Sequence, residues 1–120
     1  RGMKVGFYHS LIDWHHPEFP VDGRHPMRDD VEFREAESAG DIHRYADYLH
    51  AQTRELLTGF GKIDVIWFDF SYPDRDFGWS RGKGKEDWRS EKLLATVRQL
   101  QPHILVNDRL DVAGDFKTPE

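Results

Sequence analysis

The sequence predicts an α/β fold with a sheet of about three parallel strands and two intervening helices. Short apolar segments alternate with longer amphipathic ones, which is typical of strands joined by helical crossovers. Residues 63–69 are apolar on both strand faces, which favours a parallel sheet that is covered on each side. Polar residues follow each apolar segment, and the carboxyl ends of parallel strands are where such folds place their chemistry.

The first half of the chain predicts a strand, a long loop and a helix. Residues 3–10 fit a strand, and residues 17–40, with Pro and Gly among many charges, predict a loop. Residues 41–58 carry apolar side chains at helical spacing. Asp41 is placed to cap the first turn of this helix, and Gly59 is placed to end it.

The second half predicts a strand, a loop, a helix and a short strand. Residues 63–69 are too short for a helix and rich in β-branched and aromatic side chains, so we expect a buried strand. Residues 71–85 contain Pro and several Gly and predict a loop. An amphipathic helix over 86–100 is expected to end before Pro102, and a strand over 104–107 follows.

This order of elements favours part of a (β/α)8, or TIM-type, barrel. Two strand–helix units and a third strand make up less than half of such a barrel, which typically has about 250 residues. A doubly wound sheet is the alternative, but no glycine-rich phosphate-binding turn follows a predicted strand. We therefore expect residues 1–120 to be a fragment of a single catalytic (β/α)8 domain, truncated at both ends.

Composition argues against several classes of partner. The net charge is −5 and the acidic and basic residues are interspersed, so nucleic acid is not expected as a partner. No apolar run approaches the ~18 residues of a membrane span. There is no cysteine, which excludes disulfides and thiolate chemistry within the chain. The start at Arg1-Gly2, directly before a strand, leaves the compartment open, and nothing indicates the oligomeric state.

Asp69 is the main candidate for a nucleophile or general base, because it ends a buried strand where an unused carboxylate is costly. The alternative is a carboxylate that caps the next loop. Trp67, on the same face, is either core or a platform for a sugar, since sugar sites commonly pair aromatic rings with carboxylates. Arg109, past the third strand, forms a structural salt bridge, holds a carboxylate in its charged form or donates to a substrate hydroxyl.

Metal and phosphate sites have little support. His15 and His16 are adjacent and would point to opposite sides in an extended chain, and the i, i+4 pairing of a zinc-binding helix is missing. The stretch around Lys83 lacks the Walker spacing and is interpreted as a flexible loop. The residues therefore give little support to a metal site.

Glu120 gains interest as a second carboxylate that follows the third strand. Two carboxylates at the mouth of a barrel are what glycoside hydrolysis requires. One attacks the anomeric carbon as an anion, and the other protonates the departing oxygen.

Four segments in this order resemble the α-L-fucosidases of glycoside hydrolase family 29. They are Gly6 to Pro17 (GFYHSLIDWHHP), Asp64 to Asp69 (DVIWFD), Val106 to Arg109 (VNDR) and Gly114 to Glu120 (GDFKTPE). Each motif is short, but together they extend over nearly the whole chain.

The resemblance implies a retaining exo-glycosidase, without metal or organic cofactor, that acts on fucosylated oligosaccharides or glycoconjugates. Asp69 matches the family's nucleophile and Glu120 matches the general acid/base of one branch. Tyr8, Trp67 and Arg109 match positions that line the fucose pocket. For retention we expect the two carboxyl groups to lie about 5–5.5 Å apart.

The match also has gaps and leaves alternatives. Phe70 stands where many family members have Gly or Met, and the family's His-His pair lies on an earlier strand, so it is not assigned to His15-His16. With half of the pocket missing, the 120-residue piece is expected to be inactive by itself. The alternatives are a non-catalytic relative that binds fucose and a (β/α)8 glycosidase with another sugar preference.

Overall fold

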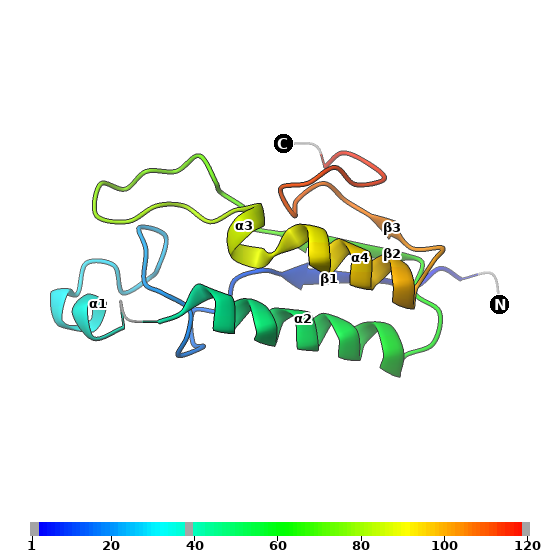
Figure 1. Cartoon of the computed structure of the whole chain (residues 1–120), viewed down its shortest axis with the longest axis horizontal. Helices are drawn as coiled ribbons and strands as arrows, with labels where there is room; N and C mark the ends of the chain where they lie inside the picture. Colours follow the sequence, from blue (N-terminus) through cyan, green and yellow to red (C-terminus); the bar gives the residue numbers. More distant parts are fainter. Residues whose placement is uncertain (1–2, 38–39, 119–120) are drawn as a thin grey trace.

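The computed structural model describes residues 3–37 and 40–118, which form a mixed α/β arrangement (Figure 1). The elements in chain order are β1 (Gly6–Ser10), α1 (Val31–Glu37), α2 (Ile42–Gly59), β2 (Val65–Asp69), α3 (Lys85–Trp88), α4 (Ser90–Leu100) and β3 (Leu105–Val106).

The three strands form one parallel sheet, as predicted, and their order in it is β1-β2-β3. In the β1–β2 register Tyr8 lies opposite Trp67 and Ser10 lies opposite Asp69. All strands therefore end at the same edge. Figure 1 shows the loops after β1 and β2 gathered beyond this edge, together with α1.

Helices α2 and α4 pack on one face of the sheet and form the core with it (Figure 1). The side chains of this core include Leu49, Leu57, Ile66, Phe68, Leu93, Val97 and Val106. The prediction that helices cover both faces is not met within the described part of the chain. The second face carries Trp67, half-buried, and exposes Tyr8 and Leu105.

The predicted helix over 41–58 is confirmed, including its cap, since the backbone N–H of His43 donates to Asp41 Oδ1 at 2.9 Å. The predicted helix over 86–100 is instead split at Arg89, whose φ of 50° ends α3 before α4 begins. Helix α1 lies in the stretch expected to be loop only.

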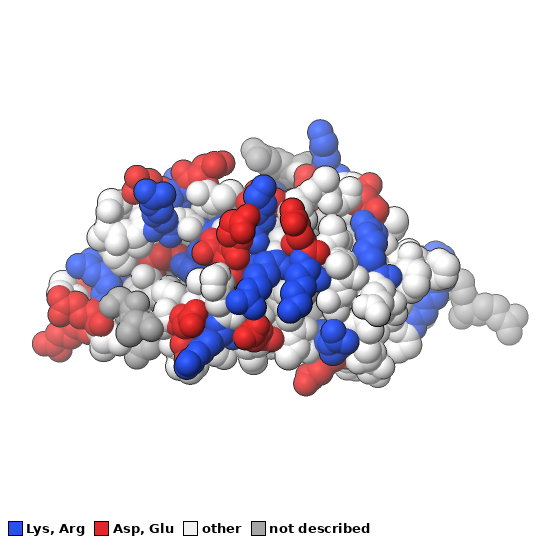
Figure 2. Space-filling model, viewed as in Figure 1, with Lys and Arg blue, Asp and Glu red and all other residues white. Residues whose placement is uncertain are grey.

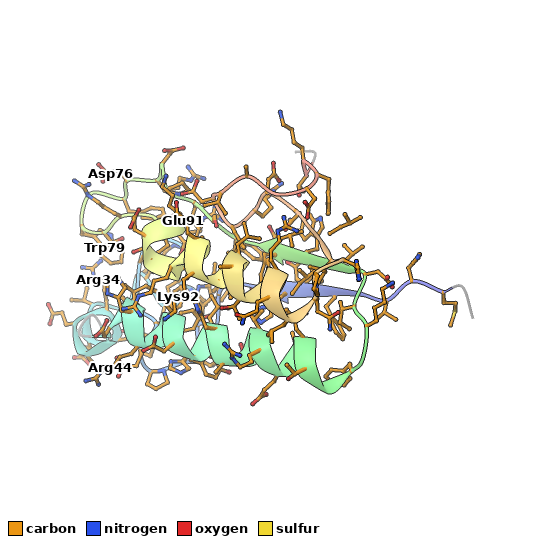
Figure 3. The ribbon with its side chains drawn as sticks, turned by 45° about the vertical axis from the view of Figure 1, so that its right-hand side comes forward. Arg34, Arg44, Asp76, Trp79, Glu91 and Lys92 are labelled. Carbon is orange, nitrogen blue, oxygen red and sulfur yellow. The ribbon has the colours of Figure 1, made fainter. Side chains whose placement is uncertain are left out.

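The loops beyond the strand ends pack against one another. In the β2–α3 loop (residues 70–84), the Trp79 ring lies under the Arg34 guanidinium of α1, 4.4 Å from its Cζ (Figure 3). Lys83, expected in a flexible loop, is instead buried and bonded to Asp22 of the β1–α1 loop.

Figure 2 shows acidic and basic side chains interspersed over the visible face, in agreement with the small net charge of −5. Within residues 3–37 and 40–118, no helix combines the length and hydrophobicity that crossing a membrane requires.

Candidate active site

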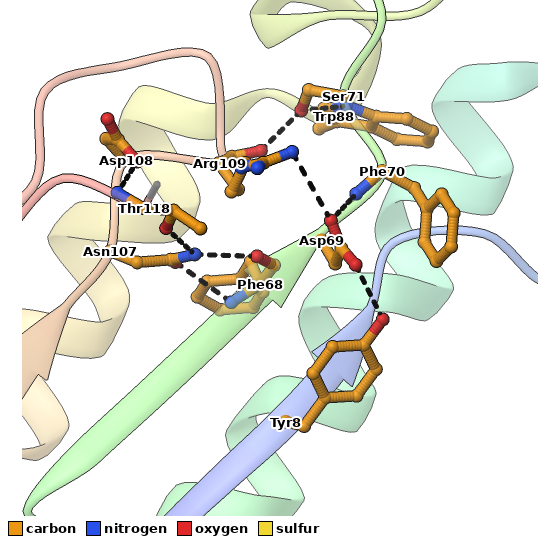
Figure 4. A network of polar contacts seen from close by, with 10 residues as sticks. All are labelled: Tyr8, Phe68, Asp69, Phe70, Ser71, Trp88, Asn107, Asp108, Arg109 and Thr118. Carbon is orange, nitrogen blue, oxygen red and sulfur yellow. Dashed lines mark hydrogen bonds and ion pairs between the residues drawn. The ribbon is translucent and has the colours of Figure 1, made fainter. Parts of the chain in front are cut away.

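Asp69 lies at the C-terminal end of β2, and its carboxylate has a donor on each oxygen (Figure 4). The backbone N–H of Phe70 donates to Oδ1 at 2.9 Å, and the Tyr8 hydroxyl donates to Oδ2 at 2.8 Å. The side chain is 20% exposed. The carboxylate is therefore held in a fixed orientation while part of it stays accessible from the open face of the sheet.

Arg109 approaches the same carboxylate from the segment that follows β3 (Figure 4). One guanidinium nitrogen lies 3.8 Å from Asp69 Oδ1, so the two side chains form an ion pair between the ends of β2 and β3. The backbone of Arg109 is anchored, because its carbonyl accepts a 2.6 Å hydrogen bond from Ser71 Oγ. The indole N–H of the buried Trp88 donates in turn to Ser71 Oγ at 3.1 Å.

Asn107 joins the third strand to β2 through its side chain. Its Oδ1 accepts from the Phe68 backbone N–H at 2.9 Å, and its Nδ2 donates to the Phe68 carbonyl at 2.8 Å. Nδ2 also contacts Thr118 Oγ1 at 3.1 Å. Because Asn107 is buried and fully engaged, it fixes the chain two residues before Arg109.

Two stacked aromatic side chains lie beside the Asp69 carboxylate on the sheet. Tyr8 and Trp67 stack with ring centroids 5.4 Å apart and an interplanar angle of 23°. The Arg109 Cζ lies 6.0 Å from the Trp67 ring centroid. Desolvation, the hydrogen bond to Asp69 and its charge raise the pKa of the Tyr8 phenol to about 12. The Tyr8 hydroxyl therefore keeps its proton at any ordinary pH and remains a hydrogen-bond donor to Asp69.

The structure brings together four of the five candidates named from the sequence, Tyr8, Trp67, Asp69 and Arg109. Glu120 lies outside the described residues. Sequence reasoning missed the supporting roles of Ser71 and Asn107. Their positions after β2 and after β3 are the signal that could have found them, because polar side chains at strand ends commonly organise such sites.

Metal ligation has no support among the described residues, where no group of three or more His, Asp or Glu side chains could hold an ion. His16 has a structural role, since its Nδ1 accepts from the backbone N–H of Glu18 at 3.1 Å.

Comparison with known proteins relates this chain to one protein family. A family model described as alpha-L-fucosidase matches residues 1–120. The structure superposes on alpha-L-fucosidase isoenzyme 1 from Paenibacillus thiaminolyticus with a TM-score of 0.82 and 45% identity, covering 98% of this chain. It also superposes on the alpha-L-fucosidase AlfC from Lactobacillus casei, as a D200A variant in complex with Fuc(α1,6)GlcNAc. That match has a TM-score of 0.68 and 26% identity over 99% of this chain.

These relatives are longer than the chain. It spans 28% of the Paenibacillus chain and 37% of the AlfC chain. A curated rice protein whose name places it among the alpha-L-fucosidases is 24% identical over 107 residues, which are 88% of this chain and 15% of the rice protein. Since the family match includes every residue, the chain belongs to the alpha-L-fucosidase family, glycoside hydrolase family 29.

Proposed function

We propose that this chain forms the nucleophile-bearing part of an exo-acting, retaining α-L-fucosidase. The observation that carries the proposal is the Asp69 carboxylate at the end of β2, held by Tyr8 and Phe70 and faced by Arg109. The proposal includes the fold of the complete domain, a (β/α)8 barrel in which β1, β2 and β3 are three of the eight strands. The uncovered face of the sheet would then line the inside of the barrel.

In the first step, an ionised Asp69 oxygen attacks the anomeric carbon of the fucosyl group. The bond from that carbon to the leaving oxygen breaks, its electron pair goes to the leaving oxygen, and Glu120 donates a proton there. The product is a covalent fucosyl ester of Asp69 and a free alcohol. The carboxylate attacks as an anion, and its contacts with Arg109 and with the Tyr8 hydroxyl hold it in position for the attack.

In the second step, water attacks the same carbon from the opposite side. Glu120 takes a proton from the water, the ester bond breaks, and its electrons return to the Asp69 carboxylate. Two inversions give overall retention. Tyr8 and Arg109 hold the carboxylate in one orientation through both steps, and the stacked Tyr8–Trp67 pair offers an apolar surface to the sugar ring.

The proposal is tested by Asp69→Gly in the complete protein. Turnover of an aryl α-L-fucoside should fall by at least about a thousandfold, because the reaction loses its nucleophile. Azide should partly restore it by occupying the space left by the carboxylate. Asp47→Gly, which removes an exposed carboxylate of α2, is the matched control and should retain activity.

Other outcomes separate the alternatives. Unchanged turnover in Asp69→Gly would remove Asp69 from the mechanism. A wild-type protein that binds fucose but cleaves no fucoside would be a non-catalytic relative. Faster cleavage of aryl galactosides or xylosides than of fucosides would assign another sugar preference.

Glu120→Ala tests the second carboxylate with leaving groups of different basicity. Fluoride departs without a proton, so cleavage of α-L-fucosyl fluoride should survive far better than cleavage of a fucosyl disaccharide. Equal losses on both substrates would contradict the acid role of Glu120.

A further inference from the structure

The Ser71 hydroxyl lies in a chain of hydrogen bonds that leads from the core to the ion pair of the candidate active site (Figure 4). It donates to the Arg109 carbonyl at 2.6 Å and accepts from the Trp88 indole N–H at 3.1 Å. We propose that Ser71 is a positioning residue of the fucosidase reaction, whose hydroxyl fixes the place of Arg109 and, through it, the orientation of Asp69. The inference rests on the proposed function and adds to it a residue that acts through Arg109 and not on the substrate.

The Arg109 side chain depends on its backbone for its position. Within the described part of the chain, its guanidinium lies 3.8 Å from the Asp69 carboxylate, and its Cζ lies 6.0 Å from the Trp67 ring centroid. Both contacts are longer than a hydrogen bond, so neither fixes the guanidinium in one direction. The side chain is also 34% exposed. The place of the guanidinium is therefore set mainly by the backbone from which it extends.

The backbone around Arg109 is held on both sides, and Ser71 holds the residue itself. Before it, the buried Asn107 side chain bonds to the N–H and the carbonyl of Phe68 at 2.9 and 2.8 Å. After it, Leu110 is fully buried. Between these two fixed points, the hydrogen bond from Ser71 orients the Arg109 carbonyl.

Trp88 determines which way the Ser71 hydroxyl points. An indole N–H can only donate, so the Ser71 oxygen must accept from it, and the hydroxyl proton is left for the Arg109 carbonyl. The indole is itself held in place, because Trp88 is fully buried and lies beside the rings of Phe19 and Tyr45. A fixed donor in the core therefore orients the hydroxyl toward Arg109.

One short segment carries both the nucleophile and the group that holds its ionic partner. Ser71 follows Asp69 by two residues, and Phe70 between them donates its N–H to Asp69 Oδ1 at 2.9 Å. Any movement of this segment carries the Arg109 backbone with it, so the separation of the ion pair is kept. Without the Ser71 hydroxyl, Arg109 would be free to move away while Asp69 stays in place.

The test is a double-mutant cycle in the complete protein, with kcat/KM for an aryl α-L-fucoside as the measurement. Ser71→Ala should lower kcat/KM roughly tenfold, the scale of one hydrogen bond. In the Arg109→Gln background the same change should lower it by less than about twofold, because the side chain through which Ser71 acts is already missing. Ser71→Thr keeps the hydroxyl and should stay within about threefold of wild type.

The matched control is Thr53→Val. The buried Thr53 hydroxyl also donates to a backbone carbonyl, that of Leu49 at 2.9 Å, but it lies within α2, in the helical layer. Its loss should leave kcat/KM unchanged even where it lowers the free energy of unfolding. Chemical denaturation of each variant establishes that the activities of folded proteins are compared.

A loss from Ser71→Ala that is equally large in the Arg109→Gln background would overturn the inference, because Ser71 would then not act through Arg109. Wild-type kcat/KM in Ser71→Ala would also overturn it, as would a loss in Ser71→Thr as large as in Ser71→Ala. These results leave the proposed function intact, since Asp69→Gly tests it separately. A wild type that cleaves no fucoside would contradict the proposed function, and the inference with it.

Discussion

At the scale of single residues, the Tyr8 hydroxyl is the side-chain group that donates a hydrogen bond to the Asp69 carboxylate. The hydrogen bond of 2.8 Å should favour the reactive orientation of the carboxylate. Tyr8→Phe keeps the ring over Trp67 and removes only the hydroxyl. We expect kcat/KM for an aryl fucoside to fall roughly tenfold, the scale of one hydrogen bond to a charged group. A variant with wild-type kinetics would show that the hydroxyl plays no part in positioning Asp69.

The titration of Tyr8 gives a second prediction. Its pKa of about 12 has desolvation as the largest cause, followed by the hydrogen bond and charge of Asp69. The neutral Tyr8 phenol therefore contributes fully to the free energy of unfolding below the ordinary pKa of 10.0. This contribution is lost as the pH rises through about 12 and the folded protein loses the phenol proton. In Asp69→Asn the pKa of Tyr8 should fall, which NMR of labelled tyrosine rings can measure. An unchanged pKa would contradict the coupling.

A buried ionic cluster joins the two loops beyond the strand ends. Asp22 is 1% exposed and Lys83 is 5% exposed, and the Asp22 carboxylate accepts from both Lys83 Nζ and the Tyr72 hydroxyl. Lys83→Met leaves a buried carboxylate without its cation, so the free energy of unfolding should fall by about 3 kcal/mol or more. Chemical denaturation of the complete protein measures this.

The control for that prediction is Asp47→Asn, which breaks the exposed pair between Asp47 and Arg89. Because both side chains are accessible to solvent, the loss should stay below about 1 kcal/mol. Comparable losses in the two variants would show that burial does not govern the strength of these pairs.

At the scale of elements, the segment after β3 is fastened to α4 by one ion pair. Arg98 donates to both oxygens of Asp115 at 2.8 and 3.0 Å, and Asp115 Oδ2 also accepts from the Val106 N–H. The hydrogen bond from Arg98 is the main cause that lowers the pKa of Asp115 below its usual 3.8. This pair holds in place the segment that carries Arg109.

The sign of the pH effect follows from this lowered pKa. The ionised Asp115 carboxylate stabilises the folded protein above about pH 3.8, its ordinary pKa. This stabilisation is lost as the pH falls through the lower pKa that Asp115 has in the folded protein. Asp115→Asn should cost about 0.5–1 kcal/mol near neutral pH and flatten the acid limb of the unfolding curve. Asp74→Asn, at an exposed position in the β2–α3 loop, is the control. Identical acid limbs in wild type and Asp115→Asn would contradict the assignment.

The elements that periodicity predicted are those that bury a regular apolar stripe. β2, α2 and most of α4 fall into this group, and their order sufficed to predict a parallel sheet. Helix α1 was missed because its segment follows several Pro and Gly residues and buries little. The break at Arg89 was missed because neither Pro nor Gly marks it, although its φ is 50° and the preceding Trp88 is fully buried.

The candidate site could be predicted where chemistry follows directly from a strand end. Asp69 ends β2 and Arg109 follows β3, and parallel strands carry both to one edge. The role of Tyr8 came from the family resemblance and not from spacing. The contacts of Ser71, Asn107 and the Phe70 N–H depend on how loops from separate strands meet, which local pattern does not contain.

At the scale of the whole molecule, the distribution of helices is one-sided. α2 and α4 cover one face of the sheet, while the face with the candidate site exposes Tyr8 at 58% and Leu105 at 50%. Within the described residues, β1 and β3 each pair with no strand other than β2, so the outer edge of β1 is open. The outer edge of β3 is only partly covered, because the Val106 carbonyl accepts from the Asp115 N–H at 2.7 Å and Asn107 bridges to Phe116. A closed barrel would pair those edges and enclose that face.

This one-sidedness predicts how the 120-residue chain behaves by itself. Without further strands the site has one wall, the sugar is not surrounded, and the exposed apolar face and strand edges favour association. The isolated chain should release no nitrophenol from an aryl α-L-fucoside, whereas the complete protein should. It should also bind a hydrophobic dye and elute as oligomers in size-exclusion chromatography. Fucosidase activity in a monomeric isolated chain would show that these three strands are sufficient, and would contradict the need for a closed barrel.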